Sequence, residues 1–122
     1  MTEAVIVSAV RTPIGTSYKG TLREMLAEEL ATVVVGEAVA RSGLNAEDFG
    51  DIILAESTAG GGDIARYAAL ANGMTQVPGQ AVQRWCAGSL TAIGNAAAHI
   101  RSGMETALIA GGTHSYSTSP QL

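Results

Sequence analysis

The sequence has little of what several classes of protein require. It contains one cysteine, Cys86, so an internal disulfide is excluded and a reducing compartment is expected. No apolar run approaches the roughly 20 residues of a membrane helix. The seven Lys and Arg residues, against eleven Asp and Glu, are scattered, which argues against a nucleic-acid partner. Because Glu3 and no basic region precedes the first apolar run, we expect an untargeted, soluble, cytoplasmic protein.

What the sequence does contain indicates one compact domain. Its 122 residues are 47% hydrophobic, which is enough apolar material to fill a core and exclude disorder as the main state. Fifteen glycines beside only 4% aromatic residues indicate backbones that pack closely. This composition favours a layered α/β protein.

The first part of the chain shows a strand pattern followed by a helix pattern. Residues 4–10 form an unbroken, mostly β-branched apolar run, which predicts a strand buried on both faces. A loop to about Gly20 should follow. The apolar spacing after it predicts an amphipathic helix, in which Thr21 and Glu24 have capping-box spacing and Gly43 marks the end.

The middle of the chain repeats this order. Residues 52–55 predict a second buried strand, residues 65–71 a short helix and residues 80–85 a third strand. The loop between the first two contains three successive glycines, Gly60 to Gly62. It lacks the lysine of a P-loop and the spaced glycines of a dinucleotide fingerprint, so an ordinary loop is favoured over a nucleotide site.

The last part predicts one more helix and one more strand. Small residues run from Cys86 to about Ser102 and indicate a central, packed helix. Residues 106–112 predict a fourth strand, whose glycine pair, Gly111 and Gly112, allows another backbone to approach. The alternation of strands and helices predicts an α/β fold.

The single cysteine stands where a nucleophile could be activated. At the first turn of a helix, the Cys86 sulfur would meet the positive end of the helix dipole and unpaired amides. Those amides could also donate to an oxygen that becomes negative when a carbonyl is attacked. The alternative use of a free cysteine is as a small buried hydrophobic residue, and the residues alone leave both interpretations open.

Other polar residues are weaker candidates. His99 would lie roughly 20 Å along the helix from Cys86, which excludes direct contact. His114 follows the glycine pair and could approach Cys86 only if the fourth strand is adjacent. For Arg11 and Arg66, hydrogen bonds to loop carbonyls or salt bridges are favoured, and for Trp85 a place in the core or an interface.

Several segments together carry a family resemblance. Residues 3–15 strongly resemble the opening of thiolases, the acyl-CoA acetyltransferases and acyltransferases. The most specific segment, residues 83–90, matches the segment that holds the family's nucleophile. Three more segments resemble the family in the same order: residues 18–22, residues 65–70, and the glycine pair with residues 115–120.

This resemblance implies a thiolase-like layered fold, with a mixed central β-sheet and a buried helix that carries the nucleophilic Cys86. Residues 1–122 would be the N-terminal thiolase domain, incomplete, with the C-terminal half absent. In the full protein Cys86 would attack the keto carbon of a 3-ketoacyl-CoA, release acetyl-CoA and hold an acyl thioester that CoA removes. The reverse direction is a Claisen condensation. The acyl-enzyme predicts ping-pong kinetics.

The resemblance also implies partners and a setting. CoA thioesters are the expected substrates, in fatty-acid β-oxidation or other lipid metabolism, without a metal or a bound redox cofactor. A homodimer or homotetramer is expected. Because the family's second cysteine and its histidine-bearing loops lie in the later part of its chains, these 122 residues alone should not complete a turnover.

Departures from the family keep alternatives open. His114 stands where many members have glutamate, Tyr116 where many have methionine, and residues 87–89 differ from the commoner order of small residues. One alternative is a condensing enzyme of the ketoacyl synthase type, which takes its substrates from a carrier protein. Another is a non-catalytic chain, either a fragment or a subunit of a split protein, in which Cys86 has no chemical role.

Overall fold

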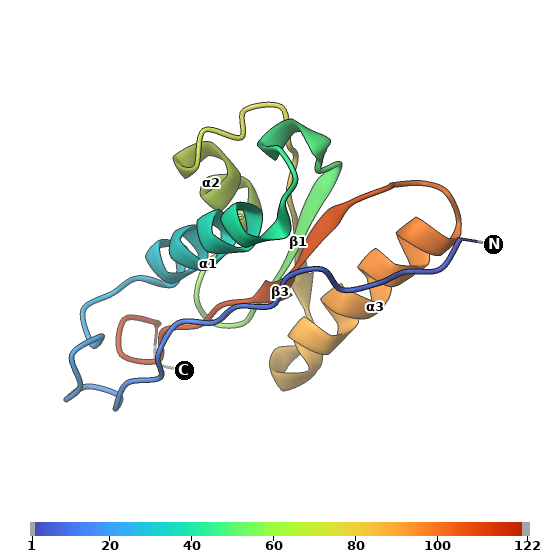
Figure 1. Cartoon of the computed structure of the whole chain (residues 1–122). Coiled ribbons are helices and arrows are strands. Elements are labelled where there is room, and N and C mark those ends of the chain that lie inside the picture. The colour runs from blue at the N-terminus through green and yellow to red at the C-terminus, as the bar shows by residue number, and fades with distance from the viewer. Residues whose placement is uncertain (1, 121–122) are drawn as a thin grey trace.

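The computed structural model describes residues 2–120 as three helices around a small parallel sheet (Figure 1). The helices are α1 (Ala27–Ser42), α2 (Ile64–Ala71) and α3 (Gly88–Arg101). The strands are β1 (Asp51–Glu56), β2 (Gln80–Gln83) and β3 (Leu108–Gly112). Single 3-10 turns occur at Ala46–Asp48 and Trp85–Ala87.

The sheet has the order β2-β1-β3, and both of its strand pairs are parallel. In the register, Ile53 of β1 lies opposite Gln80 of β2 and Ala110 of β3. A mixed sheet was predicted, whereas the three strands of residues 2–120 all run the same way. Parallel strands align their carboxyl ends, so the loops that follow them meet at one edge of the sheet.

The two faces of the sheet are covered separately, which gives the predicted layers. Alternate residues of β1 point to opposite faces: Ile52 and Leu54 pack in the core formed with α1 and α2, and Ile53 packs against α3. Figure 1 shows α1 and α2 on one side of the strands and α3 on the other. The expected burial of α3 holds for one face, where Ala92 and Ala96 lie on the sheet, whereas Leu90 is 77% exposed.

The prediction of a strand at residues 4–10 is wrong. This segment has no strand partner within residues 2–120, and Val5, Ile6 and Val7 are 64–79% exposed. In Figure 1 the blue N-terminal trace passes β3 without joining the sheet. An apolar β-branched run favours an extended backbone, but a strand also requires a hydrogen-bonding neighbour, which no local pattern supplies.

The predicted start of the first helix is also wrong. Residues 21–24 form turns, and α1 begins at Ala27, where the Glu29 carboxylate accepts a hydrogen bond from the Leu26 amide at 2.8 Å. Glu29, which lies three residues after Leu26 just as Glu24 lies three residues after Thr21, therefore caps the start of the helix. The end at Gly43 is confirmed, because this residue has the left-handed conformation (φ 78°) that glycine adopts without strain.

The other predicted elements are confirmed with small shifts of their ends. The third strand stops at Gln83, two residues before its predicted end, because the chain turns at Arg84 and Trp85. The fourth strand begins at Leu108. No helix within residues 2–120 has both the length and the apolar character needed to cross a membrane.

Candidate active site

A cavity of about 530 Å³ opens at the edge of the sheet where the three strands end. Residues 55–58 line it from the end of β1, and residues 112–114 and Tyr116 line it from the end of β3. The remaining wall comes from the chain that leads from β2 into α3, namely Trp85, Cys86 and Ser89. In open α/β sheets this edge is the usual place for a ligand, because loops from several strands converge there.

Cys86 lies in the single 3-10 turn between β2 and α3, and its thiol is free and exposed. The regular α-helix begins two residues later, at Gly88, so the predicted first turn is a 3-10 turn that continues into the helix. Trp85, which precedes the cysteine, has φ 48°, a conformation rare for a residue with a large side chain. The turn is thus sharply bent immediately before the thiol.

Two glycines let this turn approach the sheet. A Cβ on Gly88 would lie 2.6 Å from the Ala55 Cβ of β1. A Cβ on Gly112, at the end of β3, would overlap the Ser89 hydroxyl. Because Gly88 and Gly112 carry no side chain, the start of α3 packs close to the ends of β1 and β3, which brings Cys86 to the cavity.

A chain of hydrogen bonds joins the three strand ends. His114 Nδ1 lies 2.8 Å from Ser57 Oγ, so the loops after β3 and β1 are linked. Gln83 Nε2 donates to the Ser57 carbonyl at 3.0 Å, and Gln83 Oε1 accepts from the Trp85 amide at 2.8 Å. Gln83 therefore holds the strained turn that carries Cys86 and ties it to the residue that hydrogen-bonds His114.

His114 and Tyr116 form an aromatic corner of the cavity. Their rings meet edge to face, with centroids 6.0 Å apart and planes at 68°. Tyr116 contacts Tyr18 in the same manner at 5.9 Å, and the Tyr18 amide donates to Ser117 Oγ at 2.8 Å. The loop after β3 is thereby anchored to the segment that precedes α1, which fixes Tyr116 at the cavity.

Of the two histidines, only His114 reaches the cavity. Although β3 is adjacent to β1 and not to β2, the loop after β3 still brings His114 to the cavity of Cys86. His99 lies in the last turn of α3, at the far end of the helix, as predicted. Its Nδ1 is buried without a hydrogen-bond partner within residues 2–120.

Arg66 and Arg11 make hydrogen bonds of the kind that the sequence favoured. Arg66 donates to the carbonyls of Thr75 and Val77, the latter at 2.6 Å, and Arg11 donates to the Thr12 carbonyl at 3.0 Å. Both therefore hydrogen-bond to loop carbonyls. Trp85 is 60% exposed and lines the cavity, so the prediction of a core position is wrong, while the interface alternative stays a prediction.

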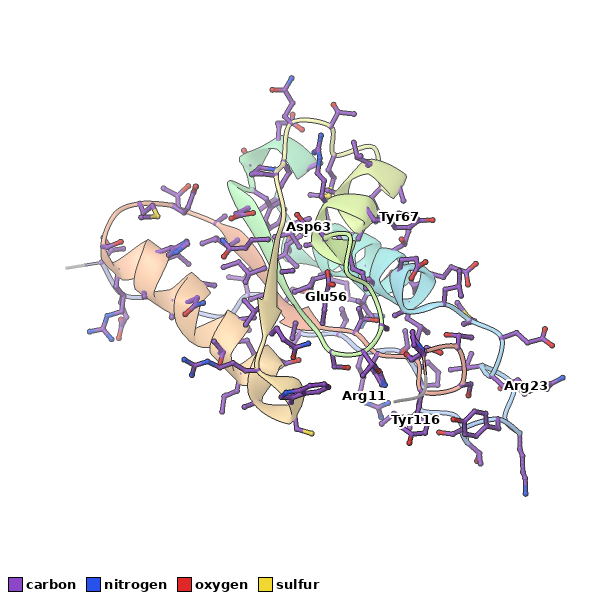
Figure 2. The ribbon with its side chains drawn as sticks, turned by 180° about the vertical axis from the view of Figure 1, so that it is seen from behind. Arg11, Arg23, Glu56, Asp63, Tyr67 and Tyr116 are labelled. Atoms are coloured by element: carbon purple, nitrogen blue, oxygen red, sulfur yellow. The ribbon has the colours of Figure 1, made fainter. Side chains whose placement is uncertain are left out.

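Sequence reasoning missed Glu56, which organises the glycine loop. This carboxylate is only 6% exposed and accepts hydrogen bonds from the Gly61 and Ile64 amides at 2.8 and 2.7 Å. Asp63 ends the same loop, caps α2 and lies near Glu56 in Figure 2. The loop amides thus bind a side chain of the protein itself, as expected for an ordinary loop. An acidic residue at the end of an apolar strand was the available signal.

The described residues provide no obvious metal centre. Within residues 2–120, no three His, Cys, Asp or Glu side chains are grouped so that they could hold an ion. What the cavity does contain is a thiol, an imidazole and several hydroxyl groups. This set suits covalent chemistry at sulfur with hydrogen bonds to a bound molecule.

Comparison with known proteins agrees with this geometry. A family model described as the thiolase N-terminal domain matches residues 4–122. The Escherichia coli 3-oxoadipyl-CoA/3-oxo-5,6-dehydrosuberyl-CoA thiolase is 40% identical over 98% of this chain and 31% of its own length. An acetyl-CoA acetyltransferase of Cupriavidus necator is 36% identical over 100% of this chain and 32% of its own.

A solved structure supports the same assignment. The crystal structure of the Bacillus anthracis acetyl-CoA acetyltransferase superimposes with a TM-score of 0.92 and 38% identity, over 97% of this chain and 30% of that one. The chain thus spans about a third of the length of the relatives it matches. With the sequence match, the shared fold and the cysteine turn in agreement, this chain belongs to the thiolase family.

Proposed function

We propose that the protein carrying this chain is an acyl-CoA acyltransferase of the thiolase type, with Cys86 as the nucleophile that holds the acyl group. The observation that carries the proposal is the place of the thiol. It is exposed in a cavity at the carboxyl edge of a parallel sheet, one turn before a fourteen-residue helix. Names of relatives, which include thiolases and acetyl-CoA acetyltransferases, support the same reaction class.

The proposed reaction has two covalent steps. The Cys86 thiolate adds to the keto carbon of a 3-ketoacyl-CoA, and a bond forms between sulfur and this carbon. When the carbonyl re-forms, the carbon–carbon bond to the CoA-bearing fragment breaks. Its electron pair stays on that fragment, which takes up a proton and leaves as acetyl-CoA. The thiol of a second CoA then gives up its proton and attacks the thioester, which releases the shortened acyl-CoA and restores the Cys86 thiolate.

The described residues account for the first bond and its orientation. The positive end of the α3 dipole lies beside the reacting centre and stabilises negative charge there, whereas the Ala87 and Gly88 amides, which the sequence led us to expect unpaired, already donate to the Arg84 and Trp85 carbonyls. Gln83 Oε1 accepts from the Trp85 amide and so holds the turn that carries the thiol. Following the family resemblance, the groups that move protons belong to the part of the protein beyond these residues.

Acylation of the full-length protein tests the proposal. We expect that incubation with acetyl-CoA adds one acetyl group, seen by intact-mass spectrometry and mapped by peptide sequencing to Cys86. Cys86→Ala should abolish both this adduct and thiolysis of acetoacetyl-CoA. Asn95→Ala, on the exposed surface of α3, should leave both unchanged. A folded wild-type protein that accepts no acyl group, or accepts it elsewhere, would show that Cys86 is not the nucleophile and favour the non-catalytic alternative.

A further inference from the structure

The Ser57–His114 pair lies in the cavity of Cys86 but has no part in the acyl transfer described above. Both residues line that cavity, and the ring is fixed on two sides. Ser57 Oγ holds Nδ1 at 2.8 Å, and the Tyr116 ring contacts the imidazole at its edge. A side chain fixed in this way presents its remaining nitrogen in a constant direction.

That remaining nitrogen is available for a ligand. Within residues 2–120, His114 Nε2 has no hydrogen-bond partner, and the side chain is exposed. The Ser57 hydroxyl can donate or accept, so it tolerates the tautomer in which Nε2 carries the proton. The imidazole can therefore donate a hydrogen bond from the cavity wall.

By exposed area, most of the cavity wall around His114 is apolar. Much of the nearby lining is apolar or aromatic and includes Ala55, Trp85 and Tyr116. The Glu56 carboxylate also lines the cavity, but its two oxygens already accept from the Gly61 and Ile64 amides. A few polar groups in a largely apolar pocket are what select among ligands, because a ligand without a matching group leaves them unpaired.

We propose that His114, positioned by Ser57, determines substrate specificity by donating a hydrogen bond to an oxygen on the acyl chain of the 3-ketoacyl-CoA. The preferred substrates are then acyl chains that carry a carboxylate or hydroxyl oxygen, rather than plain alkyl chains. This inference rests on the proposed function, because it concerns the acyl group that Cys86 receives. Ser57 acts through His114 and is a positioning residue.

The test compares three substrates of equal chain length with the full-length protein. They are 3-oxohexanoyl-CoA, 3-oxoadipyl-CoA and 6-hydroxy-3-oxohexanoyl-CoA, which end in a methyl group, a carboxylate and a hydroxyl group. We expect the wild type to have a higher kcat/KM for at least one oxygen-bearing substrate than for 3-oxohexanoyl-CoA. A preference for 3-oxoadipyl-CoA would show that the oxygen belongs to a carboxylate, and a preference for 6-hydroxy-3-oxohexanoyl-CoA that it belongs to a hydroxyl group.

Variants then separate the imidazole from its support. His114→Leu should lower the preference for the oxygen-bearing substrate about tenfold, mainly through a higher KM, as expected for the loss of one hydrogen bond. His114→Gln, whose amide retains a donor, should keep most of it. Ser57→Ala should lower the preference about threefold, because the ring is no longer held. The Ser57 carbonyl still accepts from Gln83 in that variant, so the Cys86 turn stays supported.

The outcomes distinguish this inference from the function on which it rests. If His114→Leu keeps the wild-type preference while it still cleaves 3-oxohexanoyl-CoA, or if the wild type prefers the alkyl substrate, the inference is wrong and the acyltransferase function stands. If none of the three substrates acylates Cys86 in the wild type, the proposed function itself is wrong. Should His114→Leu not fold, His114→Ala takes its place, and an unchanged preference in it would overturn the role of His114. An unchanged preference in Ser57→Ala would overturn the role of Ser57. Asn95→Ala serves as the matched control and should keep the wild-type ratio.

Discussion

Replacing Gly88 by alanine should destabilise the protein, although alanine is normally the better helix residue. Gly88 has right-handed helical angles (φ −61°, ψ −47°), so the backbone accepts alanine, and helix propensity alone would stabilise by about 1 kcal/mol. Against this, the new Cβ would lie 2.6 Å from the Ala55 Cβ, where ordinary contact begins at 3.4 Å. The helix and β1 would have to separate by about 1 Å, and overpacking of this kind costs roughly 1–3 kcal/mol. The net loss should be about 1 kcal/mol.

The same helix offers a matched control. A Cβ on Gly94 meets nothing within 4 Å, so Gly94→Ala should stabilise the protein by about 0.5–1 kcal/mol. Denaturant unfolding of the full-length protein, followed by circular dichroism, gives both changes, and the rate of Cys86 alkylation reports the position of the turn. We expect opposite signs of the stability change and an altered alkylation rate only in Gly88→Ala. Equal stabilisation by both substitutions would refute the close approach of α3 to the sheet.

Two further predictions concern hydrogen bonds around the cavity. Glu56→Ala should lower the free energy of unfolding by about 2–5 kcal/mol, because the Gly61 and Ile64 amides lose their acceptor. Glu56→Gln keeps one acceptor oxygen and should lower it less. Thermal or denaturant unfolding measures both changes, and a loss below about 0.5 kcal/mol in the alanine variant would contradict the assigned hydrogen bonds. Gln83→Leu should slow acylation of Cys86 about tenfold with little change in stability, because the Trp85 turn loses its acceptor at an exposed position. Single-turnover mass spectrometry with acetyl-CoA measures this rate, and an unchanged rate would show that Gln83 does not organise the turn.

Local sequence patterns predicted most of the elements and one site residue. The buried strand at residues 52–55, the helix after the glycine loop and the end of the first helix at Gly43 follow from periodicity and from glycine at a helix end. Cys86 was identified from its place between a strand and a helix, together with the family resemblance. These features depend on neighbours within a few residues, which the sequence shows directly.

Two errors have the same physical origin. Residues 4–10 have the composition of a buried strand but are exposed, because pairing depends on a neighbouring strand that can lie anywhere along a chain. The first helix starts at Ala27 and not at Thr21, because Glu24 and Glu29 both have capping spacing, the Leu26 amide donates to Glu29, and residues 16–25 form turns through backbone hydrogen bonds. Several local patterns compete, and long-range contacts such as the Thr113 hydroxyl bond to the Ala27 carbonyl favour one of them.

The sequence by itself determined the alternation of strands and helices and the place of the lone cysteine at a strand-to-helix turn. Both follow from the local periodicity of apolar residues and from the positions of glycines. Only the tertiary structure decided what surrounds that cysteine. Ser57 and His114 are 57 residues apart, and Gln83 lies on a third strand, so no spacing in the chain connects them. They meet because parallel pairing aligns the carboxyl ends of β1, β2 and β3 at one edge, and because Gly88 and Gly112 leave room for α3 to rest on it.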